Sequence, residues 1–197
     1  EGAGKDWIAY CEGMGLVTRQ PQKLGDIIAL EGSNAILMTY YRNNIQHLFA
    51  LPSLIASLFE NKDSLGRDKI VFLASVAYPY LQSELFLKYQ PDEARKVINQ
   101  WIDVLIEHDL LKPLDDDRIG RPEEGTEAML RLRVLSRFII QTVERYHIAL
   151  GILRKYGSGK ISAAELEEQS ALLAERMSIL FGLNAPEFFD KSLFRNF

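Results

Sequence analysis

Residues 37–54 have the sequence LMTYYRNNIQHLFALPSL, and the rest of the chain is organised around them. Apolar residues recur in this stretch at helical spacing, which predicts an α-helix. The stretch is too apolar for a surface helix. The apolar run around Pro52, from Leu48 to Phe59, is about a dozen residues, shorter than the ~20 needed to cross a bilayer. We therefore expect a helix at the buried centre of a helical domain.

Four polar side chains lie within two turns of this predicted helix: Arg42, Asn43, Asn44 and His47. A second apolar helix, expected at about residues 67–89, carries one carboxylate, Glu84, among apolar neighbours. Because a buried charge is tolerated only when it is paired and hydrogen-bonded, we expect Arg42 to meet Glu84. Asn43, Asn44, His47 and Tyr78 are expected as supporting partners. The expected buried polar centre consists of Arg42, Asn43, Asn44, His47 and Glu84. The alternative is that both charged groups reach solvent and never meet.

Composition indicates an ordinary globular protein of 197 residues, with 47% apolar and 25% charged residues. The net charge of −4 argues against a nucleic-acid-binding protein, which needs a basic surface. The single Cys11 excludes an internal disulfide and multi-cysteine metal sites, as is typical of a reducing compartment. We expect residues 1–197 to form a single helical domain, with a possible subdivision into 1–120 and 121–197.

The predicted fold is mainly α, a multi-helix bundle of about seven helices with two small β-hairpins. Ser33 or Asn34 is expected to cap the helix that contains residues 37–54, and Pro52 and Pro79 to kink or break their helices. The hairpins are expected at about residues 16–30 and 110–119. The helices are expected at about residues 5–16, 37–54, 67–89, 91–110, 123–156 and 162–182, with a last one beginning at Asn184.

No residue pattern predicts catalysis, a cofactor or a metal ion. The three histidines, His47, His108 and His147, are far apart in the sequence and lack carboxylates or Cys11 at metal-ligand spacing. Gly159-Lys160 is followed by Ile161, where a phosphate-binding loop requires Ser or Thr. We therefore assign no catalytic, cofactor-binding or metal-binding residue.

A basic stripe can be drawn along the predicted helix 123–156. It could contact anionic lipid headgroups or an acidic partner. A solvated helix face is the simpler interpretation, and we expect it. The stripe consists of Arg133, Arg137, Arg145 and Arg154.

Several segments, in order along the chain, resemble one known family. They are Asp26-Ile27-Ile28, residues 37–45 with Tyr40-Tyr41-Arg42-Asn43-Asn44, His47, residues 51–54, Tyr78-Pro79, residues 84–87 and residues 184–191. Together they resemble the C-terminal region of the bacterial membrane-associated glycerol-3-phosphate acyltransferases. The resemblance runs from about Gly25 to Leu193.

The resemblance implies a parent enzyme that moves a fatty acyl group from acyl-CoA or acyl-carrier protein to the sn-1 hydroxyl of glycerol 3-phosphate, in phospholipid biosynthesis. In that family a His-x4-Asp motif supplies the general base, and a Glu-Gly-x-Arg motif helps hold the substrate phosphate. Neither motif is present here. The residues five positions after the histidines are Pro52, Pro113 and Ile152, and Glu124-Gly125-Thr126 is followed by Glu127 instead of Arg.

We therefore expect the chain to be an excised, non-catalytic C-terminal part of the longer enzyme, since it also lacks an initiator Met. Its expected partners are the catalytic domain of the same polypeptide and the cytoplasmic face of the bacterial inner membrane, to which the enzyme binds peripherally. The fragment itself is expected to be soluble. The alternative is an autonomous helical binding or regulatory module without enzymatic activity.

Overall fold

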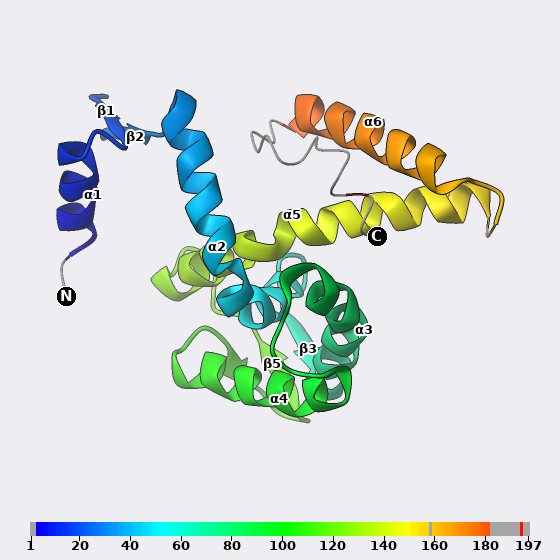
Figure 1. Ribbon diagram of the computed structural model, residues 1–197. Helices are drawn as coiled ribbons and strands as arrows, with labels where there is room; N and C mark the ends of the chain where they lie inside the picture. The colour runs from blue at the N-terminus through cyan, green and yellow to red at the C-terminus, as the bar shows by residue number, and fades with distance from the viewer. Residues whose placement is uncertain (1–2, 158, 182–193, 195–197) are drawn as a thin grey trace. The chain divides into compact units, whose positions relative to one another are not determined.

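The computed structural model describes residues 3–157, 159–181 and 194, and it divides into two compact units, Glu1–Ile45 and Gln46–Phe197 (Figure 1). Unit 2 includes residue 120, where we placed a possible subdivision. Six helices and two small antiparallel sheets lie in the described ranges. The mainly α fold with small β elements is confirmed, and the seventh predicted helix, from Asn184, lies outside the described residues.

Unit 1 contains helix α1 (Gly4–Gly13), strands β1 (Thr18–Gln20) and β2 (Ile27–Ala29), and the first part of helix α2 (Gly32–Ser57). The two strands pair antiparallel, with Thr18 opposite Ala29, as the predicted hairpin required. Not one of the described residues 3–45 is buried.

Both long apolar helices differ from expectation, α2 at its first residues and both helices at their prolines. Helix α2 begins at Gly32, so Ser33 and Asn34 lie inside the helix instead of capping it. It continues through Pro52 to Ser57, and α3 (Arg67–Leu85) continues through Pro79. The predicted helix breaks are therefore wrong, and the kinks given as the other possibility stay a prediction. Each proline removes one backbone donor, but Pro52 lies in the buried part of α2, where packing holds the helix together.

Unit 2 adds to the rest of α2 the helices α3, α4 (Pro91–Glu107), α5 (Glu127–Tyr156) and α6 (Ala163–Phe181). Strands β4 (Lys112–Pro113) and β5 (Arg118–Gly120) form the second predicted hairpin. A third strand, β3 (Ser64–Gly66), was not predicted and pairs with the other side of β5, giving the order β3-β5-β4. A three-residue strand is too short to show an alternating pattern in the sequence.

The main core of unit 2 lies between the last part of α2, α3, α4 and the first half of α5. Its largest fully buried side chains are Tyr78, Phe59, Ile55, Ile70, Leu81, Ile98, Ile102, Leu111, Met129, Leu132 and Ile139. A smaller cluster joins α5 to α6 through Ile148, Ile152, Ala171, Ala174 and Phe194. In the described part of the chain, no helix is both long enough and apolar enough to span a membrane.

Local signals fix the ends of several helices. Pro91 opens α4, and the Gln90 amide donates to Glu93 Oε2 at 3.0 Å. The predicted capping box of α6 is present, because Glu165 N donates to Ser162 Oγ (3.2 Å) and Ser162 N donates to Glu165 Oε2 (3.0 Å). The pKa of Glu165 is lowered by the two hydrogen bonds that its carboxylate accepts, from Ser162 N and from Ser162 Oγ (2.7 Å).

Candidate functional site

The polar centre of unit 2 is an ion pair between α3 and α5. Arg145 Nη2 donates to Glu84 Oε1, and the two side chains are only 8% and 20% exposed. Arg145 was expected on a solvated stripe, and that expectation is wrong. The buried face of α5 follows steps of three residues through Ile139, Thr142 and Arg145. This places Arg145 against α3 instead of in solvent.

Neighbouring groups extend the pair into a network. Tyr146 Oη donates to Glu84 Oε2 at 2.5 Å, so both carboxylate oxygens have partners. Burial and this hydrogen bond to a carboxylate raise the pKa of Tyr146 well above its ordinary value. Thr142 Oγ1 accepts from Arg145 Nη2 (3.3 Å) and from Gln46 Nε2 (3.4 Å), and Gln46 also donates to the Phe138 carbonyl at 2.8 Å. The network therefore ties α2, α3 and α5 together.

An apolar groove of about 290 Å³ lies beside this network. Tyr80 and Tyr146, whose ring centroids are 6.0 Å apart, are part of its wall. The lining comes from α2, the residue after it, α3 and α5: Leu54, Ser57, Leu58, Leu73, Val76, Ala77, Tyr80, Leu81, Val143, Tyr146, His147 and Leu150. Its chemistry suits an apolar ligand, with polar groups confined to the two phenols, one hydroxyl and one imidazole.

The predicted buried centre is not found at Asn43, Asn44 and His47, because the buried part of α2 begins only at Ala50 and these three side chains are exposed. Arg42 is half-buried, and its guanidinium donates to Asn43 Oδ1 from Nε (3.2 Å) and Nη2 (3.0 Å). Of the predicted set, Glu84 alone is part of the network described above, where its cationic partner is Arg145. His47 lines a separate hollow with Tyr78, Leu87 and Trp101.

A second partly buried carboxylate, Glu144, lies on α5. Glu144 Oε2 is buried and has no hydrogen-bond partner among the described residues, and burial raises the pKa of this carboxyl while Arg137 opposes the rise. Within the described ranges no three His, Cys, Asp or Glu side chains are grouped closely enough to hold a metal ion.

Sequence reasoning missed Arg145, Thr142 and Gln46. The available signal was the spacing on α5: counting in threes from Ile139 reaches Thr142 and then Arg145, which places a cation on the inward face. The sequence alone did not say which carboxylate that cation would meet, since Glu84 is 61 residues away.

The fold and site define a mainly α-helical region whose helices are joined by a buried ion pair. The family model described as the C-terminal region of glycerol-3-phosphate acyltransferase matches residues 1–197. The glycerol-3-phosphate acyltransferases of Pseudomonas fluorescens Pf-5, Pseudomonas syringae pv. tomato DC3000 and Pseudomonas aeruginosa PAO1 are each 45% identical to this chain. Each match covers 100% of the chain and 24% of the relative. The chain therefore belongs to the glycerol-3-phosphate acyltransferase C-terminal family, which confirms the resemblance.

The chain spans about a quarter of the length of these curated relatives.

Proposed function

We propose that this chain is the non-catalytic C-terminal region of a glycerol-3-phosphate 1-O-acyltransferase. The whole enzyme acylates the sn-1 hydroxyl of glycerol 3-phosphate from acyl-CoA or acyl-carrier protein, in phospholipid biosynthesis. The observation that carries the proposal is the match of all 197 residues to the C-terminal region of that enzyme family.

The sequence supports a non-catalytic role. None of the three histidines has an Asp five residues later, and the closest approach to Glu-Gly-x-Arg ends at Glu127. In the structure the two carboxylates of this segment form surface ion pairs. Glu124 Oε1 accepts from Arg121 (2.5 Å) and Arg133 (3.0 Å), and Glu127 pairs with Arg131 (2.6 Å). These groups are engaged in holding the start of α5.

The proposed role is to support the catalytic domain of the same polypeptide at the cytoplasmic face of the inner membrane, where the enzyme binds peripherally. The internal pairing of Glu84, Arg145 and Tyr146 supports this role, because a network whose charges are satisfied within the fold stabilises the packing of its helices.

An acyl-transfer assay tests the proposal. It compares the purified chain with the longer polypeptide, in which this chain is joined to the proposed catalytic domain. Each protein is incubated with palmitoyl-CoA and radiolabelled glycerol 3-phosphate, and lysophosphatidate is measured. We expect product from the longer polypeptide and none from the chain alone. Turnover by the chain alone would contradict the non-catalytic role, and its loss in a His47→Ala, His108→Ala or His147→Ala variant would locate the base.

The second candidate function is an autonomous binding module, which the apolar groove between α2, α3 and α5 favours. Binding of a fluorescent fatty acid to the chain alone would support it. A Val76→Trp substitution should then block the groove, whereas Phe72→Trp, on the same helix but outside the lining, should not. Co-sedimentation with liposomes and with the separately expressed catalytic portion would show which partner the chain prefers.

A further inference from the structure

Unit 1 has an apolar surface but no core of its own. None of its described residues, 3–45, is buried, although large apolar side chains make up much of the unit. Scattered exposed apolar residues are ordinary on a protein surface, but their density is higher in unit 1: eleven large ones lie within its 45 residues, against sixteen among the described residues of unit 2. They are Trp7, Tyr10, Met14, Leu24, Ile27, Leu30, Ile36, Leu37, Tyr40, Tyr41 and Ile45, each at least 39% exposed.

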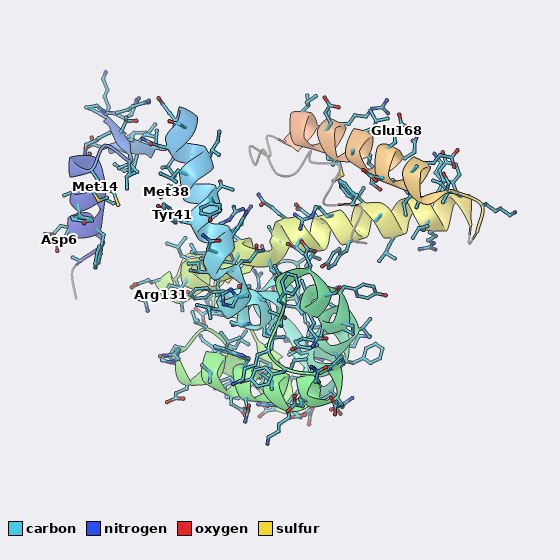
Figure 2. All side chains as sticks on the ribbon, viewed as in Figure 1. Asp6, Met14, Met38, Tyr41, Arg131 and Glu168 are labelled. Atoms are coloured by element: carbon cyan, nitrogen blue, oxygen red, sulfur yellow. The ribbon has the colours of Figure 1, made fainter. Side chains whose placement is uncertain are left out.

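These residues form stripes on both helices of the unit. Trp7 and Tyr10 on α1 and Met14, the residue after it, recur at helical spacing and are 60%, 62% and 54% exposed. On the first part of α2, Leu37, Tyr41 and Ile45 follow every four residues, with Ile36 and Tyr40 beside them. Met14 and Tyr41, one residue from each stripe, are labelled in Figure 2. A stripe at this spacing is the pattern of a helix face that packs against another surface.

The side-chain hydrogen bonds and ion pairs described inside unit 1 are exposed. Arg19 donates to both oxygens of Glu12 at 2.7 and 2.8 Å and to Asp26 at 3.0 Å, and Asn34 donates to the Gly15 carbonyl at 2.7 Å. The Glu12 and Asp26 ion pairs are 26–41% exposed, a setting in which ion pairs add little stability. A hairpin with three-residue strands is marginal without a hydrophobic face to pack on. Unit 1 therefore needs a covering surface.

We propose that unit 1 is the docking element that packs on the rest of the acyltransferase polypeptide, through the stripes on α1 and the first part of α2. This inference rests on the proposed function, in which the chain is one part of a longer enzyme. The surface that covers unit 1 is the part of the enzyme polypeptide outside this chain, because 76% of the length of the relatives lies outside the segment that this chain matches. A covalently joined partner has a high effective concentration, so a coreless unit can remain docked.

Charge favours a protein surface over an anionic membrane as the occupant. Residues 1–45 contain four Lys and Arg and five Asp and Glu, a net charge of −1. Attraction to anionic lipid comes from clustered Lys and Arg near the apolar face, which unit 1 lacks. A nearly neutral unit with exposed Trp and Tyr matches the composition of a protein interface core.

Hydrogen exchange measured by mass spectrometry tests the proposal on the chain and on the longer polypeptide. We expect amides of α1 and of residues 33–45 to exchange at least about tenfold more slowly in the longer polypeptide. Amides of α4, in the core of unit 2, should exchange equally in both. In the longer polypeptide Tyr41→Glu should abolish the added protection. Leu24→Glu is the control and should leave the added protection unchanged. Leu24 is in the same unit, but it lies in the turn between β1 and β2 and is already fully exposed.

Three outcomes overturn the docking proposal: equal exchange of unit 1 in both proteins, protection that rises with concentration of the chain alone, and protection produced by phosphatidylglycerol vesicles added to the chain alone. Acyl transfer by the longer polypeptide is measured in the same samples. Turnover without added protection rejects docking and leaves the proposed function standing. Added protection without turnover supports docking and contradicts the proposed function.

Discussion

At the scale of single residues, the pair of Glu84 and Arg145 has the strongest energetic consequence. Removing both charges from a buried pair is often neutral, but removing one leaves the other desolvated and unpaired. Glu84 has two donors, Arg145 and Tyr146, which lowers the cost of its burial. The pair therefore joins α3 to α5, and we expect few single substitutions of either residue to be tolerated.

We expect Arg145→Met to lower the free energy of unfolding by about 3 kcal/mol, because Glu84 then loses its cation in a mostly buried position. Urea denaturation measures the loss. Arg131→Met is the matched control on the same helix, since its pair with Glu127 is 67% and 75% exposed and should contribute below about 1 kcal/mol. Adding Glu84→Leu to Arg145→Met should recover most of the loss; a single variant as stable as the control would contradict the account.

At the scale of elements, the end of α3 contains a backbone conformation that its residue does not favour. Phe86 follows the last residue of α3 with φ 53° and ψ 45°, the left-handed region in which Gly is usual at a helix end. For other L-residues this conformation costs roughly 1–2 kcal/mol. The Phe86 side chain is 90% exposed and recovers little of that cost by packing.

Phe86→Gly should therefore raise the free energy of unfolding by about 1 kcal/mol, measured by urea denaturation at constant m-value. Phe86→Ala is the control, because it removes the same ring but keeps the Cβ that causes the strain. It should change stability by less than about 0.5 kcal/mol. Equal effects of Gly and Ala would show that the ring, and not the backbone, sets the stability at this position.

At the scale of the whole molecule, burial is unevenly divided between the two units. Every buried residue in the described ranges lies at Ala50 or later, and the two apolar clusters both belong to unit 2. Stability follows buried apolar area, so unit 2 should carry almost all of the free energy of unfolding of this chain. Unit 1 should open locally at low cost.

Limited trypsin digestion should accordingly cut first within residues 1–45, where Lys23 and Arg42 offer cleavage sites, and leave a resistant product that contains α3 to α5. Intact-mass spectrometry of timed samples measures the order of cuts. Arg95 and Lys96 on α4 are exposed basic residues in unit 2 and provide the internal comparison. Cleavage at these two sites before any cut in unit 1 would contradict the division.

The elements were predictable to different degrees, for physical reasons. The helices in the described ranges, the two hairpins and the capping box of Ser162 with Glu165 follow from spacing within a few residues, and the structure contains them. Strand β3 and the continuation of the helices through Pro52 and Pro79 depend on packing by distant segments. The buried polar site was predicted at the correct carboxylate, Glu84, but with other partners.

The sequence by itself determined the mainly α composition of the chain and its family, because helical periodicity and specific segments such as Tyr40-Tyr41-Arg42-Asn43-Asn44 are local properties. Only the tertiary structure decided which charged groups are buried together. Arg145 and Glu84 are 61 residues apart, and a helix with several cations does not reveal which one faces a neighbour. The tertiary structure likewise decided that burial on α2 begins at Ala50, since burial depends on which helices pack around a segment as well as on its own residues.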